Sequence, residues 1–130
     1  MYLKSTSETL EIDLEGAADP EVLTLVSYVD HHYGNDTKHC GCQEGSSADT
    51  TDTTILAAPA EGTWREIKEI LVFNSDNAAA TVTIQLNNGT IARPVFKAAL
   101  PAGGEHIQWN PSGGWTTILG TGALYTTAHA

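Results

Sequence analysis

The feature that most constrains this chain is the regular alternation of short apolar runs and turn residues between Thr53 and Leu119. Gly, Asn and Pro separate the runs, and turn signals recur about every eight to twelve residues. Such spacing is typical of antiparallel sheets that form a sandwich or a barrel. No catalytic motif of a recognised kind lies in this stretch. The pattern therefore predicts a small β-domain that acts through its surfaces.

The alternation also predicts which side chains face the core. In the run Thr81–Leu86, the three aliphatic side chains are expected inward and the three polar ones outward. In Trp64–Asn74, Ile70 and Val72 are expected inward. Asn88-Gly89 predicts a hairpin with a type I′ turn, which needs positive φ at both central residues. Pro94 in the return strand predicts an edge or a bulge, because proline donates no ladder hydrogen bond.

Two further strands are predicted near the N-terminus. Thr9–Glu15 places Leu10, Ile12 and Leu14 on one face and three acids on the other, which indicates a half-buried strand. Val22–Asp30 is rich in β-branched residues and predicts a second strand. We expect the two to form a strand pair within residues 1–33, part of the sandwich or packed on it. A short helix beginning at Pro20 remains an alternative.

A chain of 130 residues is long enough for one core and too short for two comfortable domains. We expect an all-β fold, an antiparallel, jelly-roll-like β-sandwich of about eight short strands with one long loop. Residues 53–120 would form the core sandwich. Residues 34–52 are polar and lack apolar periodicity, so they predict the loop. Residues 121–130 predict a flexible C-terminal tail.

The formal net charge of −10 excludes several partners. Nucleic acids and anionic membrane surfaces bind clustered Lys and Arg, which this chain lacks. The acids form no calcium-loop motif. No apolar run is long enough to cross a bilayer, and the N-terminus does not resemble a secretory signal. We therefore expect a soluble protein synthesised in a cytoplasm.

The segment before the core contains the only cluster of reactive side chains. It holds three histidines and both cysteines: His31, His32, His39, Cys40 and Cys42. His and Cys are the usual zinc ligands, and four of them are enough for a tetrahedral site. However, the adjacent histidines and the CxC spacing depart from the CxxC that structural zinc sites prefer. These residues are therefore only weak metal candidates, and no cofactor is predicted.

Cys40 and Cys42 have two further interpretations. They are too close in the chain to bridge each other without straining the disulfide, so each is a candidate for an intermolecular bond to another copy. The alternative is two free thiols, the usual state in a cytoplasm. A catalytic Cys/His pair is disfavoured, because no orienting group or oxyanion hole accompanies it. We therefore do not expect an enzyme.

The three tryptophans, Trp64, Trp109 and Trp115, are candidates for a surface role. Aromatic residues at strand ends commonly cap a sandwich core or lie in a subunit interface. They also form stacking platforms in carbohydrate-binding modules. The polar groups that would bind sugar hydroxyls do not accompany them in the sequence, which favours core and interface.

The order and the amino-acid sequences of the strands and turns resemble those of small β-sandwich virion proteins of tailed bacteriophages. The shared pieces are an apolar strand with a proline turn, an Arg-led strand ending in Asn, an Ala-Ala-Thr-Val-Thr strand, Asn-Gly and Leu-Pro-Gly-Glu turns, and a Gly-Trp strand. Here they are Ile55–Pro59, Arg65–Asn74, Ala79–Leu86, Asn88-Gly89, Leu100–Glu105 and Gly114-Trp115. The N-terminal strands also look like the opening of such proteins, whereas the His/Cys segment has no counterpart.

The resemblance implies a non-enzymatic structural subunit of the virion, of the head-decoration, neck-collar or tail-accessory type. Such a subunit would assemble in several copies and bind itself and other virion proteins. Bridges through Cys40 and Cys42 would then cross-link copies. The rival interpretation is a carbohydrate-binding module for attachment to a host surface.

Overall fold

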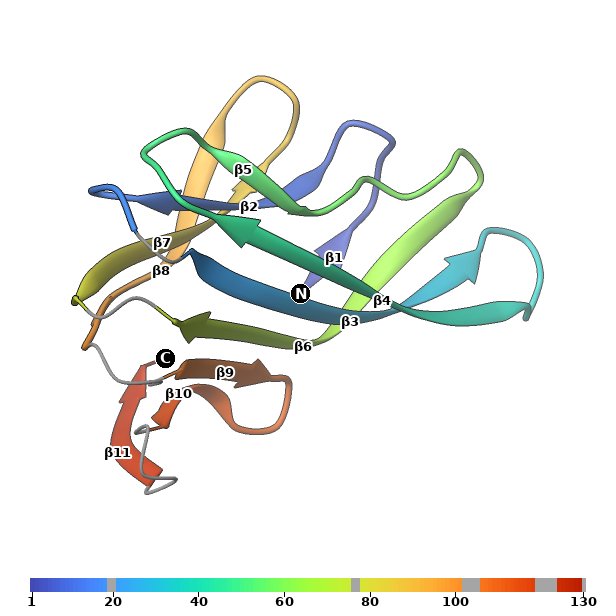
Figure 1. Cartoon of the computed structure of the whole chain (residues 1–130). Coiled ribbons are helices and arrows are strands. Elements are labelled where there is room, and N and C mark those ends of the chain that lie inside the picture. Colours follow the sequence, from blue (N-terminus) through green and yellow to red (C-terminus); the bar gives the residue numbers. More distant parts are fainter. Residues whose placement is uncertain (19–20, 76–77, 102–105, 119–123, 130) are drawn as a thin grey trace.

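The structure of the chain, a computed structural model, describes residues 1–18, 21–75, 78–101, 106–118 and 124–129. These residues form eleven strands and no helix (Figure 1). The strands are β1 (Tyr2–Leu3), β2 (Thr9–Leu14), β3 (Val22–His32), β4 (Lys38–Ser47), β5 (Thr53–Leu56), β6 (Thr63–Asn74), β7 (Ala80–Asn87), β8 (Ala92–Leu100), β9 (His106–Asn110), β10 (Gly114–Ile118) and β11 (Leu124–His129).

The strands form two antiparallel sheets packed face to face, so the predicted all-β sandwich is confirmed. Sheet A has the order β11-β10-β9-β6-β3-β4, with β1 also paired to β6. Sheet B has the order β5-β2-β7-β8. Consequently β4 and β11 are edges of sheet A, and β5 and β8 are edges of sheet B.

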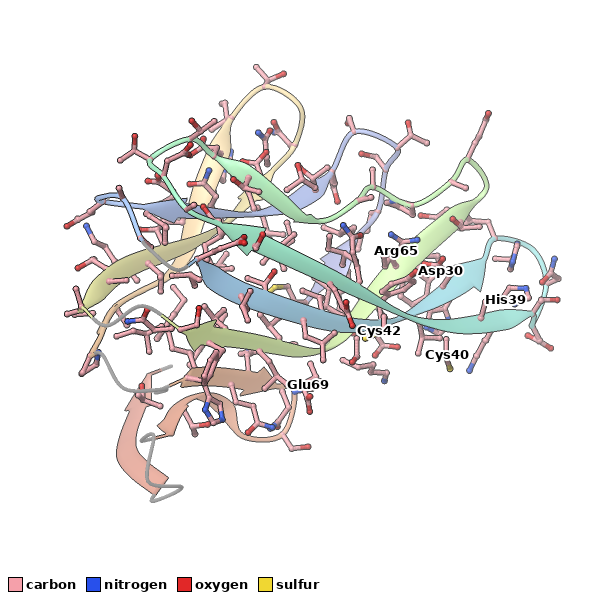
Figure 2. All side chains as sticks on the ribbon, viewed as in Figure 1. Asp30, His39, Cys40, Cys42, Arg65 and Glu69 are labelled. Carbon is pink, nitrogen blue, oxygen red and sulfur yellow. The ribbon has the colours of Figure 1, made fainter. Side chains whose placement is uncertain are left out.

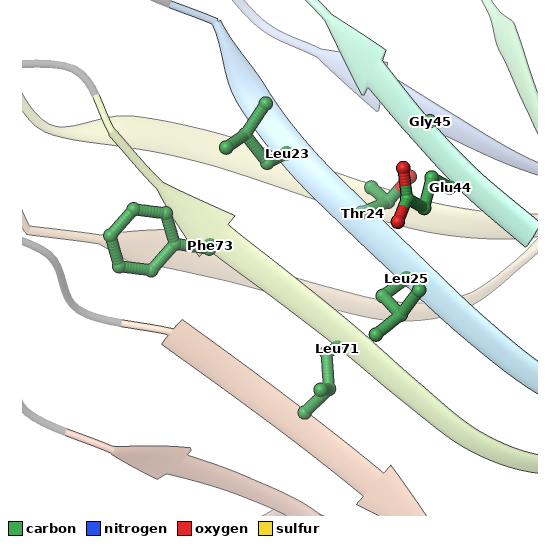
Figure 3. Close-up of a pocket in the computed structure, with 7 residues that line it drawn as sticks. All are labelled: Leu23, Thr24, Leu25, Glu44, Gly45, Leu71 and Phe73. Atoms are coloured by element: carbon green, nitrogen blue, oxygen red, sulfur yellow. The ribbon is translucent and has the colours of Figure 1, made fainter.

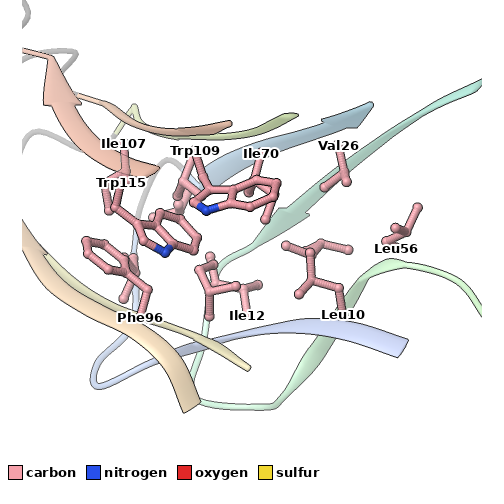
Figure 4. Close-up of a cluster of buried hydrophobic side chains, with 14 of the residues drawn as sticks. Leu10, Ile12, Val26, Leu56, Ile70, Phe96, Ile107, Trp109 and Trp115 are labelled. Atoms are coloured by element: carbon pink, nitrogen blue, oxygen red, sulfur yellow. The ribbon is translucent and has the colours of Figure 1, made fainter. Parts of the chain in front are cut away.

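The core lies between the two sheets (Figure 4). Ile70 and Val72 of β6 and Val82 and Ile84 of β7 are fully buried, as the alternation predicts. Each such side chain contributes roughly 1.5–3 kcal/mol to the free energy of unfolding through its removal from water. The outward side of sheet B is less open than expected, because the Gln85 amide donates to the Glu11 carboxylate across the β2–β7 pair at 3.0 Å, which buries both.

The N-terminal strands do not pair with each other, contrary to the prediction for residues 1–33. β2 lies in sheet B between β5 and β7, whereas β3 lies in sheet A between β6 and β4. Both edges of β2 are therefore occupied by other strands. The prediction failed because adjacent strands with a turn between them are compatible with a hairpin or with a crossover between sheets, and the sequence pattern is the same for both.

Two segments predicted to lack regular structure contain strands. β4 occupies Lys38–Ser47 of the predicted loop 34–52, and β11 occupies Leu124–His129 of the predicted tail 121–130. Nearly all of β4 is exposed or only partly buried, so its residues need no apolar periodicity. Its main chain pairs with β3, and those hydrogen bonds form with any side chain except proline. The rest of the predicted tail, and residues 102–105 of the piece Leu100–Glu105, lie outside the described residues.

The β7–β8 hairpin is confirmed, but its turn differs from the predicted type I′. The turn residues are Asn88 to Ile91, and only Gly89 has positive φ, at +94°. The Asn88 side-chain oxygen accepts hydrogen bonds from the main-chain N–H groups of Thr90 and Ile91, which closes the longer turn. Pro94 lies in an edge strand beside a bulge, as predicted.

Candidate functional site

The β3–β4 hairpin brings together most of the residues that the sequence singled out. Its register is continuous from Val22 opposite Ser47 to His31 opposite Lys38. The turn that joins the strands includes Gly34, at φ +83°, and is closed by Asn35, whose side-chain oxygen accepts the Thr37 N–H at 2.8 Å. The tip of this hairpin extends past the neighbouring loops at the right of Figure 1.

The hairpin separates the metal candidates instead of joining them. His39 lies on one face of β4, and Cys40 and Cys42 lie on the other, because successive residues of a strand alternate. His32 packs edge-on against His39 with ring centroids 5.5 Å apart, while His31 makes different contacts on β6. Among the residues that the structure describes, no three His, Cys, Asp or Glu side chains are placed to hold a metal ion.

Cys40 and Cys42 are exposed free thiols on the same face of β4 (Figure 2). Two residues of a strand span roughly 6.6 Å with parallel side chains, whereas a disulfide needs Cβ atoms about 3.5–4.5 Å apart. A bond within one chain would therefore require the strand to distort. The intermolecular bond remains a prediction, and both thiols are accessible for it.

An ion pair that sequence reasoning missed fixes the hairpin to the body of the sandwich. Arg65 donates to both carboxylate oxygens of Asp30, from Nε at 2.7 Å and from Nη2 at 3.0 Å, and its Nη1 donates to the Ala57 carbonyl at 2.7 Å. The pair raises the pKa of Arg65 above its ordinary value, chiefly through the hydrogen bond to Asp30. The guanidinium also stacks on the ring of Tyr28, 4.0 Å from its centroid.

Tyr28, which stacks on Arg65, also contacts β4. Its ring lies across Gly41, where a Cβ would come within 2.4 Å of the Tyr28 ring carbon Cζ. Any other residue at this position would require the Tyr28 ring to move. The signal for the whole cluster was present in the sequence, because Asp30 continues the inward-facing series of Val22, Val26 and Tyr28, and a charge there requires a partner.

The opposite face of the hairpin carries a stack of rings. His31 lies flat on Trp64, with centroids 4.0 Å apart and planes 9° apart, and Tyr2 packs edge-on against the same indole. His31 Nε2 lies 3.0 Å from the Glu66 carboxylate, and Lys68 donates to the same group. These bonds, that of Lys68 first, hold the pKa of Glu66 below its ordinary value.

Trp64 is the tryptophan that the structure leaves available to a ligand. With Tyr2, Lys4 and Tyr33 it lines an open hollow of about 310 Å³. Trp109 and Trp115 are buried instead, and Trp115 stacks on Phe96 with centroids 4.2 Å apart (Figure 4). For these two tryptophans, the core interpretation is therefore the one that the structure supports.

The outer face of sheet A carries a strip of apolar side chains. We call Leu23, Leu25, Leu71 and Phe73 the apolar strip. Leu23 lies opposite Phe73, and Leu25 lies opposite Leu71, so two cross-strand pairs adjoin on β3 and β6. Leu23 is 43% exposed and Phe73 is 38% exposed. The strip lines a shallow hollow of about 320 Å³, with Glu44 at one side (Figure 3).

No protein-family model, curated protein or solved structure matches the chain. Within the ranges that the structure describes, no helix is long and apolar enough to span a membrane. The exposed surfaces of the sandwich are therefore the features from which a function can be inferred.

Proposed function

We propose that the chain is a non-enzymatic structural subunit of a tailed-bacteriophage particle, assembled in several copies on the head, neck or tail. The reason for proposing a phage particle is that the sequences of the strands and turns resemble those of small virion proteins. The observation that carries the assembly role is the apolar strip, which places four large side chains in register on the solvent side of a sheet. The occupant proposed for the strip is a neighbouring protein subunit of the particle.

The physical case for the strip rests on burial and charge. A fully covered Leu or Phe side chain contributes roughly 1.5–3 kcal/mol through the water it releases, so a neighbour that covers the strip gains several such contributions. The net charge of −10 keeps free copies soluble and apart before assembly. In a symmetric particle, many such contacts act together, so each single contact can be weak.

The test uses particles assembled in host cells in which a variant replaces the wild-type chain. The double variant Leu23→Ser and Phe73→Ser should fold normally and be lost from purified particles. The matched control is Ile91→Ser, which removes an exposed apolar side chain from the turn on the other sheet and should leave incorporation unchanged. Purified particles that lack the wild-type chain would overturn the proposal.

A carbohydrate-binding role is the second candidate, and the hollow beside Trp64 favours it. Tyr2 and Tyr33 are both exposed at this hollow, and Lys4 adds a donor for sugar hydroxyls. A glycan array should then show binding that Trp64→Ala abolishes and that Ile91→Ser retains. The absence of binding by the folded wild-type chain to every glycan on the array would exclude this role.

A further inference from the structure

The structure leaves one long edge strand open in sheet A. β4 pairs with β3 on one side, and on the other side no described strand pairs with it. Such an edge presents unpaired main-chain N–H and C=O groups and is a ready template for another strand. On its inner face β4 approaches β5 and the segment after it: Ile55 lies near Gly45, and the Gln43 side-chain oxygen accepts the Ala57 N–H at 2.9 Å.

The hydrogen-bond pattern shows which groups of β4 face outward. His32 N–H donates to the Thr37 carbonyl at 3.3 Å, just beyond the His31–Lys38 pair. Because bonded and non-bonded pairs alternate in an antiparallel ladder, the odd-numbered residues of β4 bond to β3. The even-numbered residues therefore direct their main-chain groups toward the free edge: Lys38, Cys40, Cys42 and Glu44.

We propose that this edge pairs with the same edge of a second copy of the chain, antiparallel, with Gly41 on the two-fold axis. A two-fold axis perpendicular to a sheet places one residue opposite its own copy. With Gly41 there, Cys40 faces Cys42 of the second copy, and Lys38 faces Glu44 of the second copy. Both pairs occur twice, and all of their members are even-numbered residues whose main-chain groups point outward.

Charge supports this register. Lys38 and Glu44 are exposed, and in the paired state each Lys38 ammonium lies opposite a Glu44 carboxylate. The segment from Lys38 to Glu44 carries one positive and one negative side chain, so it is formally neutral within a chain of net charge −10. A register centred on Cys40 would instead place Glu44 opposite Asp36, which repels.

The backbone at the axis also suits a close approach. Gly41 has no side chain, the Tyr28 ring lies across it, and the β3–β4 register continues through this point without a shift. The pairing positions therefore exist before the second copy arrives, which limits the ordering entropy that association must overcome. The proposal deepens the proposed function, because it names a second copy as one partner of the subunit.

Disulfide cross-linking between the cysteines of two copies tests the proposed Gly41-centred register. Directly opposed, hydrogen-bonded residues have Cα atoms about 5.5 Å apart, within the range of disulfides. When diamide is added, the two thiols lose two protons and two electrons, the S–S bond forms, and the diamide is reduced to its hydrazine. A mixture of the Cys40→Ser and Cys42→Ser chains should cross-link strongly, because the remaining thiols face each other. Either variant alone should give little cross-linked dimer.

Charge exchange tests the register without cysteine chemistry. Sedimentation velocity of the reduced wild-type chain should show a concentration-dependent dimer up to about 1 mM, because interfaces below roughly 1,200 Å² are weak. Glu44→Lys should abolish the dimer by placing two lysines opposite each other. Adding Lys38→Glu to Glu44→Lys should restore it. Both positions are exposed, so circular dichroism should be unchanged throughout.

The outcomes separate this inference from the proposed function. A reduced wild-type chain that stays monomeric overturns the self-pairing and leaves the edge to a different protein, while incorporation into particles remains a separate observation. Failure of the double charge variant to restore the dimer overturns the Gly41-centred register. Equal cross-linking of the mixture and of the single variants overturns it too.

Discussion

Two edge strands of this sandwich, β4 and β8, differ in how they meet solvent. β8 carries Pro94, which lacks an N–H, and a bulge at Val95 where Ile84 faces Phe96 and Gln85 faces Pro94. Exposed Arg93 and Lys97 flank the bulge. β4 pairs with β3 without a register shift and contains no proline.

The difference teaches which edge is protected against pairing and which is not. Proline, bulges and charged side chains are the usual devices that prevent one sheet edge from joining another. β8 has all three. On β4 the one cation, Lys38, and the one anion, Glu44, are placed so that a second copy brings opposite charges together. The absence of protection on β4 is therefore consistent with an edge that is used.

The largest expected effect comes from removing the anchor of the β4 edge. Arg65→Ala should lower the free energy of unfolding by about 3 kcal/mol, because it leaves the Asp30 carboxylate without its partner. Removing one partner of a buried ion pair typically costs about 3–5 kcal/mol. The loss expected here is at the low end of that range because the Asp30 side chain is 20% exposed. Urea unfolding measures the loss, and amide exchange should increase in β4 and stay unchanged in β8.

The control for this variant lies on the same strand. Lys68→Ala removes a cation that is 47% exposed, and it should change the free energy of unfolding by less than about 0.5 kcal/mol. A loss at Arg65 no larger than the loss at Lys68 would contradict the anchoring role.

A smaller loss in the free energy of unfolding is expected at Gly41, where β4 carries no side chain beside the Tyr28 ring. Gly41→Ala adds a Cβ within 2.4 Å of the Tyr28 ring, so Tyr28 must move away from Arg65. Such overpacking typically lowers the free energy of unfolding by about 1–3 kcal/mol. Gly16→Ala is the matched control, since nothing lies within 4 Å of its added Cβ, and it should be neutral or slightly stabilising. Equal unfolding midpoints for the two variants would show that β4 tolerates a side chain at its centre.

The smallest effect concerns Glu66, beside the hairpin. Its folded-state pKa lies below its ordinary value of 4.5, so its contribution is present above that value and is lost as the pH falls through the folded-state pKa. Glu66→Gln should therefore lower the free energy of unfolding by about 0.5 kcal/mol at neutral pH and by less near pH 3. Urea unfolding at the two pH values measures this.

Glu61→Gln is the control for Glu66→Gln. Glu61 is exposed and makes no ion pair in the part of the chain that the structure describes, so its substitution should have no effect at either pH. A Glu66 effect that grows toward acid pH would show that the sign of the linkage is wrong.

The sequence predicts the alternating strands of the core and the edge strand β8, but it misses the edge strand β4. Ile70, Val72, Val82 and Ile84 could be assigned to the core because burial on one face imposes an alternating pattern. β4 could not be predicted in that way, because an edge strand outside the core is held by main-chain bonds that leave no apolar signature. The partition of β2 and β3 between sheets was also hidden, since it is decided by which strands occupy their edges.

The candidate site, too, could be predicted from the sequence only in part. The sequence singles out Cys40, Cys42 and Trp64. It does not show that both thiols share one face, or that Trp64 borders an open hollow while Trp109 and Trp115 are buried. These properties depend on register and on packing between sheets. The apolar strip was equally hidden, because Leu25 and Leu71 look like core residues in any linear pattern.

The central claim, that β4 is an edge for pairing and β8 is not, is tested most directly by amide exchange of the reduced chain at low and high protein concentration. The account predicts that the amides of Lys38, Cys40, Cys42 and Glu44 become more protected at high concentration, while those of β8 do not change. Exchange at these four amides that is independent of concentration, or protection that increases in β8 instead, would contradict it.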